Sequence, residues 1–392
     1  MSLIKNAFTI LTASALGLGF VEIFLSQTDF LQKSFGVHQS RMDAGLELHD
    51  HEHHFCYGPK DRLRYDEALV GMEHPNQRYF EFRNDGVSLH TYNDHGLRVS
   101  MKEATPQDSV VVLGDSFARG TLADDTETIP AFLTRWANGP VFYNFGIGGH
   151  GPTQHLINYQ RHSSLHPHDY VMLLYYLGND AQNERDLPAR LVRAKEVHAK
   201  RSGSSESSQN SFKIKINTFL EKSNTGRLLV QAKRRMEDVY EGGSQTNSDP
   251  HETANLVKKP LSQILVAANS GGKRLSIVTI PSREAYDETN FPAPQVSAQR
   301  EIMRLQKEII DEFSKQHDVP VLHLDDAFER QGIDFKEIYG WPDPHFNERG
   351  YYISAVEIGN FLSESYGLTF TFENTYVNET QYTPETASCP PE

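Results

Sequence analysis

Five short runs rich in β-branched and aromatic residues follow one another from residue 109 onward, and segments with helical periodicity separate them. The runs cover residues 109–113, 141–144, 170–176, 274–280 and 319–324. Strands that alternate with helices form a parallel sheet, because each helix carries the chain back across the sheet before the next strand begins. The alternation therefore predicts an α/β fold with a five-stranded parallel sheet.

The segment between the third and fourth runs, at about residues 181–255, interrupts this alternation. It contains a serine-rich stretch at residues 201–208, which has too little apolar surface to order itself by burial. We therefore predict a single domain that carries a partly disordered insertion, rather than two domains.

An apolar segment lies near the N-terminus, at residues 7–25, where Glu22 is the only charged residue. Its length is close to the ~20 residues that a helix needs to cross a bilayer. No small-residue cleavage pattern follows it, so we predict an uncleaved signal anchor over residues 1–25, with the catalytic domain outside the cytoplasm. A polar juxtamembrane lead-in over residues 26–92 and the domain over residues 93–392 would follow. A cleaved signal peptide, giving a secreted or periplasmic protein, is the alternative.

The charge balance restricts the partners of the protein. The chain of 392 residues has 38 Lys and Arg against 52 Asp and Glu, a formal net charge of −14. A nucleic-acid partner is excluded, because neutralising phosphates requires a concentrated basic face. The same net charge disfavours a strongly anionic polymer as substrate, unless cations gather locally near the cleft.

The two cysteines and a histidine-rich stretch raise two further questions. Outside the cytoplasm Cys56 and Cys389 could form a disulfide, although two unrelated thiols fit the sequence equally well. The spacing of the histidines and acidic residues at residues 49–54 matches no closed metal site. We therefore predict neither a metal ion nor another cofactor.

Residues with chemical function follow the predicted strands. Gly114-Asp115-Ser116 comes directly after the first strand, Gly149 lies in a glycine-rich turn after the second, and Asn179 follows the third. Asp343 and His345 precede the last predicted helix. The carboxyl ends of parallel strands meet at one edge of the sheet, which is where open α/β sheets bind ligands.

These residue types together are suited to acyl transfer. The Ser116 hydroxyl becomes a nucleophile when a base such as His345 removes its proton, and Asp343 can hold the imidazole in the required tautomer. The backbone N–H groups of Ser116 and Gly149 and the amide of Asn179 can donate to the oxyanion that forms. No metal is needed for this chemistry.

The same residues resemble, in order, the four sequence blocks of the SGNH (GDSL-type) hydrolase superfamily. The resemblance implies a three-layer α/β/α fold of the flavodoxin-like type. It also implies Ser116 as nucleophile and oxyanion donor, Gly149 and Asn179 as the other donors, His345 as base and Asp343 as its partner. The stretches at residues 93–98 and 177–180 are similar to those of membrane-anchored members. Asp343 stands two residues before His345, a D-x-H spacing that resembles polysaccharide O-acetyltransferases of the superfamily.

The function expected from this resemblance is that of an esterase or deacetylase, acting on an O-acylated carbohydrate or another small ester. Two alternatives use the same fold. The protein could be an O-acyltransferase that acylates a glycan with the same residues, or a glycan-binding module without catalysis.

Four further polar residues have expected places. Asp180 is expected to brace the start of a helix, and His323 to be a paired core histidine. We expect His150 either at the mouth of the cleft or in an exposed loop. Arg283 is expected to form a surface ion pair or to contact an anionic or carbonyl group.

Overall fold

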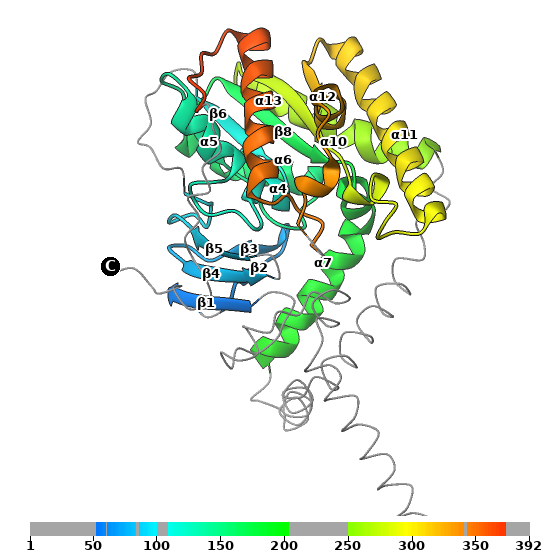
Figure 1. Ribbon diagram of the computed structural model, residues 1–392. Coiled ribbons are helices and arrows are strands. Elements are labelled where there is room, and N and C mark those ends of the chain that lie inside the picture. Colours follow the sequence, from blue (N-terminus) through cyan, green and yellow to red (C-terminus); the bar gives the residue numbers. More distant parts are fainter. Residues whose placement is uncertain are drawn as a thin grey trace, which may run out of the picture. The chain divides into compact units, whose positions relative to one another are not determined.

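The computed structural model describes residues 52–59, 61–83, 86–99, 109–203, 250–340 and 343–373 (Figure 1). The predicted anchor at residues 7–25, residues 49–51 and Cys389 lie outside these ranges. Cys56 is disulfide-bonded, and its pairing with Cys389 stays a prediction. Among the described residues, no helix combines the length and the apolar character needed to cross a bilayer.

A five-stranded parallel sheet forms the centre of the described part of the chain, as the sequence predicts. Its strands are β6 (Val110–Leu113), β7 (Phe142–Asn144), β8 (Tyr170–Tyr176), β9 (Arg274–Ile280) and β10 (Val321–His323). The spatial order is β10-β9-β8-β6-β7, which is the flavodoxin-like order. The order reverses between β6 and β8, and ligands bind outside the carboxyl ends of the strands at such a point.

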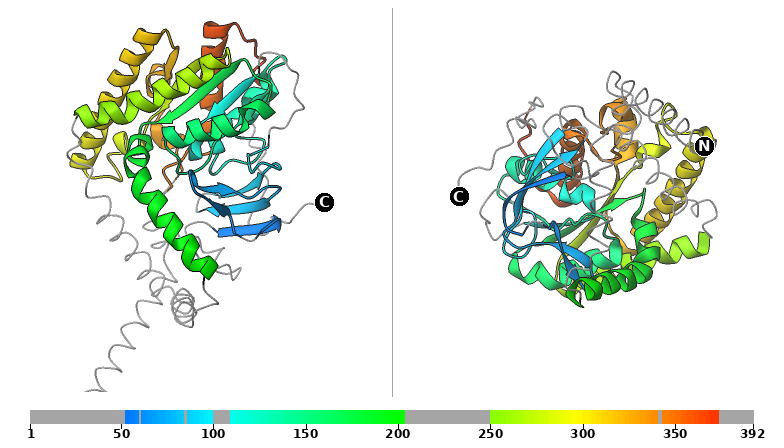
Figure 2. Two further views of the ribbon diagram at one scale, coloured as in Figure 1. Left: turned by 180° about the vertical axis from the view of Figure 1, so that it is seen from behind. Right: turned by 90° about the horizontal axis from the view of Figure 1, so that it is seen from below.

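Helices cover both faces of this sheet, which gives the predicted three layers. Successive side chains of β6 point to opposite faces, so Val110 and Val112 join one hydrophobic cluster, and Val111 and Leu113 join the other. The first face packs against α4 (Ser116–Arg119), α5 (Ile129–Trp136), α12 (Leu324–Gln331) and α13 (Glu348–Tyr366). The second face packs against α6 (Pro152–His162), α10 (Pro250–Ser270) and α11 (Ala293–His317), and α6 and α10 come to the front when the view is turned by 180° (Figure 2). Three short 3₁₀ helices complete the unit: η1 (Ser163–Leu165), η3 (Arg283–Ala285) and η4 (Phe335–Glu337).

The lead-in expected over residues 26–92 is folded from Glu52 onward. Strands β1 (Glu52–Tyr57), β4 (Arg78–Arg83) and β5 (Gly86–Thr91) form one sheet, and β2 (Leu63–Asp66) pairs with β3 (Val70–Glu73). The polar composition of this region did not indicate buried strands. Glu73, Glu81 and His90 are nevertheless fully buried. Their polar atoms are paired with one another and with buried arginines, which makes such burial possible.

The predicted insertion at about residues 181–255 is helical at both of its ends. Helix α7 (Asp180–Gly203) begins directly after β8, and α10 begins at Pro250. The residues between these two helices lie outside the described ranges. A helix start at Asp180 was expected, but the continuation of α7 to Gly203 was not, because few of its side chains are buried and its charged sequence shows no clear apolar face.

Arg98 ties the small sheet to the end of α4. Its side chain is fully buried, and its guanidinium uses all five of its N–H donors. The acceptors are Asp125 Oδ1 at 3.0 Å, Arg119 O and Gly120 O at 2.7 Å, Leu89 O at 2.9 Å and Ala123 O at 2.6 Å. The strand β5 and the helix that begins with Ser116 are therefore held by one side chain.

Asp124 beside this arginine makes the stability depend on pH. Burial raises the pKa of Asp124 to about 6, although its carboxylate accepts a hydrogen bond from Leu89 N. The folded protein therefore binds more protons than the unfolded chain between about pH 4 and 6, so the free energy of unfolding falls as pH rises through that window. In Asp124→Asn this contribution is absent. We expect the free energy of unfolding of the variant minus that of the parent to increase by up to about 3 kcal/mol from pH 4 to pH 6.

Urea denaturation at several pH values measures this difference. The exposed Asp334→Asn is the control, for which the difference from the parent should stay constant. A constant difference for Asp124→Asn as well would contradict the prediction.

Candidate active site

The turn after β6 places Ser116 at the carboxyl edge of the sheet. Gly114 has φ +156°, and a Cβ there would lie 2.7 Å from Ala118 Cβ and 2.9 Å from Leu174 O, so a glycine is required. Asp115 caps the next helix by accepting a hydrogen bond from Phe117 N at 2.9 Å. Ser116 is the first residue of α4, so its N–H is one of the amides that a helix leaves unpaired at its start.

Ser116, His345 and Asp343 form one hydrogen-bonded chain, although Ser116 and His345 are 229 residues apart in the sequence. His345 Nε2 lies 2.6 Å from Ser116 Oγ, and His345 Nδ1 lies 2.5 Å from Asp343 Oδ1. Asp343 Oδ1 also accepts a hydrogen bond from His345 N at 3.0 Å. An ionised carboxylate only accepts, so Nδ1 carries the proton and Nε2 is free to accept the proton of Ser116. The structure thus brings together the three residues that the sequence predicted.

Asn179 and Gly149 lie at the same edge of the sheet. Asn179 Oδ1 accepts a hydrogen bond from Asn183 Nδ2 at 3.0 Å, which orients the Asn179 amide and leaves its Nδ2 as a donor. Gly149 has φ +74°, a conformation that favours glycine. A Cβ on the neighbouring Gly148 would lie 3.8 Å from Ser116 Cβ, so this loop passes next to the serine.

Arg283 holds the loop that carries Asp343 and His345. It forms the expected ion pair, with Asp287, but this pair is buried, so only the expected place at the surface is wrong. Its Nη2 and Nε donate to Asp287 Oδ2 at 2.8 and 3.2 Å, and its Nη1 donates to Gly340 O and lies 3.5 Å from Asp343 O. The interpretation missed this brace because it depends on a contact between residues 57 positions apart.

Asp180 takes the bracing position expected for it. Its Oδ2 accepts a hydrogen bond from Tyr176 N at 2.9 Å, and the residue is fully buried at the start of α7. Burial, together with the nearby Asp115, raises the pKa of Asp180 well above its usual value. Burial also raises the pKa of Asp115 to about 6. The Asp180 side chain is therefore a buried structural group that binds its proton more tightly than an exposed aspartate does.

His150 and His323, the two further histidines singled out in the sequence, are both bonded within the fold. His150 is buried, with Nε2 3.0 Å from Gly71 O, so it is not an exposed loop residue, although it does line a cavity next to the Gly148 loop. The turn points this ring at β3, an element that the sequence did not predict. His323 is paired, as expected, with Thr279 Oγ1 at 2.7 Å and Asp311 Oδ1 at 3.0 Å.

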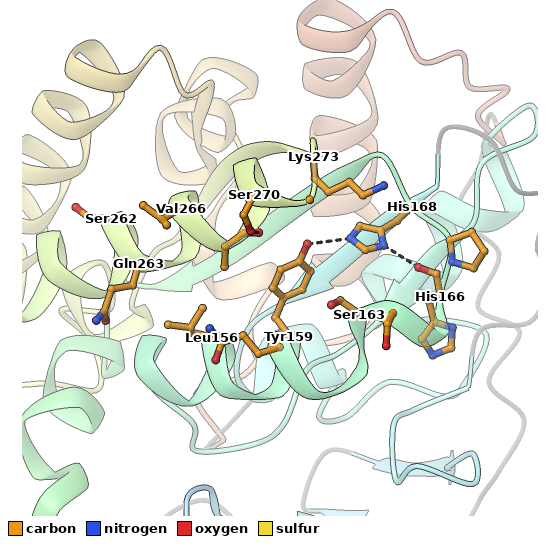
Figure 3. A pocket seen from close by; sticks show the side chains of 15 residues that line it. Leu156, Tyr159, Ser163, His166, His168, Ser262, Gln263, Val266, Ser270 and Lys273 are labelled. Carbon is orange, nitrogen blue, oxygen red and sulfur yellow. Dashed lines mark hydrogen bonds between the residues drawn. The ribbon is translucent and has the colours of Figure 1, made fainter.

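Two large cavities are formed by described residues, and the larger of these two lies away from Ser116. It has a volume of about 880 Å³ and is lined by α6, η1 and α10, with His168 between Tyr159 OH at 3.0 Å and His166 O at 2.7 Å (Figure 3). His168 and Lys273 precede β8 and β9, so this cavity is at the amino ends of the strands. The second cavity, of about 740 Å³, includes Gly148 and His150 in its wall, so it is lined by the loop that passes next to Ser116.

Metal ligands do not gather in the part of the chain that the structure describes. No group of three or more His, Cys, Asp or Glu side chains there could hold an ion.

The chain is similar to solved structures of lipases and acylhydrolases. They include a lipase/acylhydrolase from Enterococcus faecalis, at 12% identity and TM-score 0.39, covering 68% of this chain and 100% of that one. A member of the lipolytic G-D-S-L family from Veillonella parvula matches at 13% identity and TM-score 0.38, over 66% of this chain and 98% of its own. An extracellular lipase from Streptomyces rimosus matches at 13% identity and TM-score 0.39, over 64% of this chain and 99% of its own. No protein-family model and no curated protein matches the sequence.

Proposed function

We propose that the protein is a serine-dependent acyl-ester hydrolase of the SGNH type. The observation that carries the proposal is the hydrogen-bonded chain from Ser116 Oγ through His345 to Asp343, with distances of 2.6 and 2.5 Å. In this proposal Ser116 is the nucleophile, His345 is the base, and Asp343 orients the imidazole and stabilises its protonated form.

The reaction proceeds in two halves. His345 Nε2 takes the proton of Ser116 as Oγ bonds to the acyl carbon, and the carbonyl electrons move onto the oxygen. The bond to the alcohol oxygen then breaks, and this oxygen takes the proton from His345. Water attacks the acyl-enzyme with His345 again as base, which releases the carboxylic acid and returns the proton to Ser116.

The oxyanion formed in each half is stabilised by three donors in this proposal. They are the N–H groups of Ser116 and Gly149 and the Nδ2 of Asn179. Support comes from the first position of Ser116 in α4, from the loop of Gly148 beside Ser116, and from the oriented amide of Asn179. Preorganised donors of this kind are each worth about 10²–10³-fold in kcat.

The proposed substrate is an O-acylated carbohydrate or another small ester, met outside the cytoplasm by a domain that an N-terminal helix anchors. A glycan hydroxyl in place of water would make the same acyl-enzyme an O-acyltransferase, as the D-x-H spacing of Asp343 and His345 suggests by resemblance. A glycan-binding module without catalysis would not need the hydrogen bonds that connect Ser116, His345 and Asp343.

Labelling with a fluorophosphonate tests the nucleophile directly. We expect the parent and the control Ser164→Ala, in which an exposed serine is replaced, to be labelled, and Ser116→Ala to remain unlabelled. Hydrolysis of a chromogenic acetyl ester with and without an oligosaccharide then separates the two reactions. If the oligosaccharide accelerates turnover and acylated sugar is the product, the protein is an acyltransferase rather than a hydrolase. Undiminished labelling of Ser116→Ala would refute the proposed nucleophile.

Replacing the loop brace is expected to slow catalysis without removing any catalytic group. Arg283→Met removes the donors that hold Gly340 and the Asp343 loop, so His345 loses its fixed position. Misplacement of about 1 Å costs on the order of 10²-fold, and we expect this loss in kcat, with KM changed much less. The exposed Arg349→Met, which loses a pair with Glu337, is the control. A larger change in KM than in kcat, or no partial recovery in Arg283→Lys, would contradict a positioning role.

A further inference from the structure

The cavity of about 740 Å³ beside the active site has a wall built from three separate segments. The strands β2 and β3 form one side, the loop of Gly148 and His150 forms the second, and the face of α7 at residues 190–198 forms the third. The stacking of Tyr65 on His198, with ring centroids 4.4 Å apart, closes β2 against α7. Strand β2 and the far half of α7 belong to the regions in which the sequence predicted no such structure.

One end of this cavity reaches the proposed oxyanion loop. Gly148 lines the cavity and also passes next to Ser116, since a Cβ on it would lie 3.8 Å from Ser116 Cβ. From the other side, Arg190 Nη2 lies 3.7 Å from the place that a Cβ on Gly149 would occupy. The loop of Gly148 and Gly149 is therefore close both to Ser116 and to the cavity, and an ester bound at Ser116 would reach the cavity past this loop.

The cavity is cationic in a protein whose net charge is −14. Arg64, Arg190 and Arg193 line it, and Asp61 is the one carboxylate among the residues of its wall. Arg190 and Arg193 are three positions apart in α7, so they lie on the same helical face. The local charge is thus opposite to that of the whole chain.

These arginines differ from others of the fold because none of them forms a direct ion pair with a carboxylate among the described residues, although the Asp186 carboxylate lies near enough to Arg190 to raise its pKa. Arg119, Arg161 and Arg185 each form an ion pair with a carboxylate. Arg190 is half-buried, and its polar contact is a 3.4 Å hydrogen bond to Asn183 Oδ1. Burial lowers the pKa of Arg190, which is an energetic cost that a bound anion would offset.

Apolar side chains complete the wall. Leu63 and Val197 are among the exposed large hydrophobic residues, and Leu69 and Val70 also line the cavity. A guanidinium group binds carboxylate and phosphate groups with two parallel hydrogen bonds, and the apolar surface suits the carbon skeleton that bears such a group.

We propose that this cavity is a substrate subsite that binds a carboxylate or phosphate group on the ester, through Arg190 and Arg193 and with Arg64 at its margin. The proposal rests on the proposed esterase function and extends it, because it assigns an anionic class of substrate. The net charge of the whole chain disfavours an anionic substrate, whereas the proposed subsite favours one.

A matched pair of fluorogenic esters tests this subsite in the full chain. The neutral ester is 7-acetoxy-4-methylcoumarin, and the anionic ester is 7-acetoxycoumarin-4-acetate. We expect the parent to prefer the anionic ester in kcat/KM, and the double variant Arg190→Met/Arg193→Met to lower the anionic-to-neutral ratio by about 10-fold or more, since a hydrogen bond to a charged group is worth roughly 1.5–3 kcal/mol. Arg190→Lys/Arg193→Lys should recover part of that ratio.

The control removes the same charge elsewhere. Arg300→Met/Arg304→Met changes two exposed arginines of α11 and should leave the ratio unchanged. An equal ratio in the parent and in the Arg190/Arg193 variant would overturn the subsite. Because the ratio compares two esters on one preparation, a loss of folded protein does not imitate the expected result.

Two further measurements complete the test. One identifies which anionic group binds, and the other distinguishes a failure of the subsite from a failure of the proposed function. Competition by benzoate and by phenyl phosphate shows whether a carboxylate or a phosphate is preferred. If the parent hydrolyses neither ester, the proposed function fails, and binding of the fluorescent 7-hydroxycoumarin-4-acetate to Ser116→Ala then tests the subsite alone. Binding that is lost with Arg190 and Arg193 would keep the subsite, and binding that is indifferent to them would overturn it.

Discussion

Replacing Ser116 by alanine is expected to lower kcat for an acetyl ester by at least about 10³-fold. The hydroxyl that His345 Nε2 contacts at 2.6 Å is then absent, and no acyl-enzyme can form. The residual rate would come from the oxyanion donors and from binding alone. The measurement is steady-state hydrolysis of a chromogenic acetyl ester by the full chain, with Ser164→Ala as the matched control.

The triad residues should also act as one unit. Because each step requires both Ser116 and His345, the double variant Ser116→Ala/His345→Ala should be no slower than the worse of the two single variants. Additive losses would indicate that the two side chains act independently. Full activity of Ser116→Ala would exclude the proposed mechanism and leave the glycan-binding module as the better interpretation of the fold.

Replacing Arg119 by methionine is expected to lower the free energy of unfolding by about 3–5 kcal/mol. Arg119 is the last residue of α4 and is fully buried, with Nη1 3.5 Å from Glu73 and Nη2 3.3 Å from Glu81. The substitution removes a fully buried cation from both carboxylates, and the pairs that stay include Arg62, which is partly exposed, and the histidines His53 and His90 beside Glu81. Burial already raises the pKa of Glu73, so the loss of the cation forces protonation or unfolding.

The matched control is an arginine that also contacts two glutamates but lies in solvent. Arg304 pairs with Glu301 at 2.6 Å and also with Glu308, and all three side chains are more than half exposed. Exposed pairs contribute about 0–1 kcal/mol, so Arg304→Met should change the free energy of unfolding by that amount at most. Urea denaturation measures both variants, and equal losses would show that the buried pairs of Arg119 have no special weight.

The candidate site was more predictable from the sequence than its surroundings. Ser116, Gly149 and Asn179 each follow a strand directly, and the carboxyl ends of parallel strands meet at one edge, so local patterns sufficed to group them. Asp343 and His345 are close neighbours in the chain, and they needed only the correct loop to reach Ser116. The roles of these five residues remain proposals that the experiments above test.

The support of the site was not predictable in this way. Arg283 was expected at the surface, and it braces the loop of His345 through Gly340, 57 positions away. His150 was expected near solvent, and it is bonded to Gly71, 79 positions away. Such contacts join residues whose local sequences contain no sign of each other.

The sequence by itself determined the α/β class and the five-stranded parallel sheet, because periodicities of two and 3.6 residues are local properties of the chain. It also determined which residue types stand at the carboxyl ends of the strands. Only the tertiary structure decided that residues 52–92 fold into strands, because their burial depends on ion pairs such as that between Glu81 and Arg119, 38 positions apart. The tertiary structure likewise decided the charge of the cavity near Ser116. The net charge of −14 is a sum over the whole chain, whereas the charge of a cavity depends only on the side chains that line it after folding.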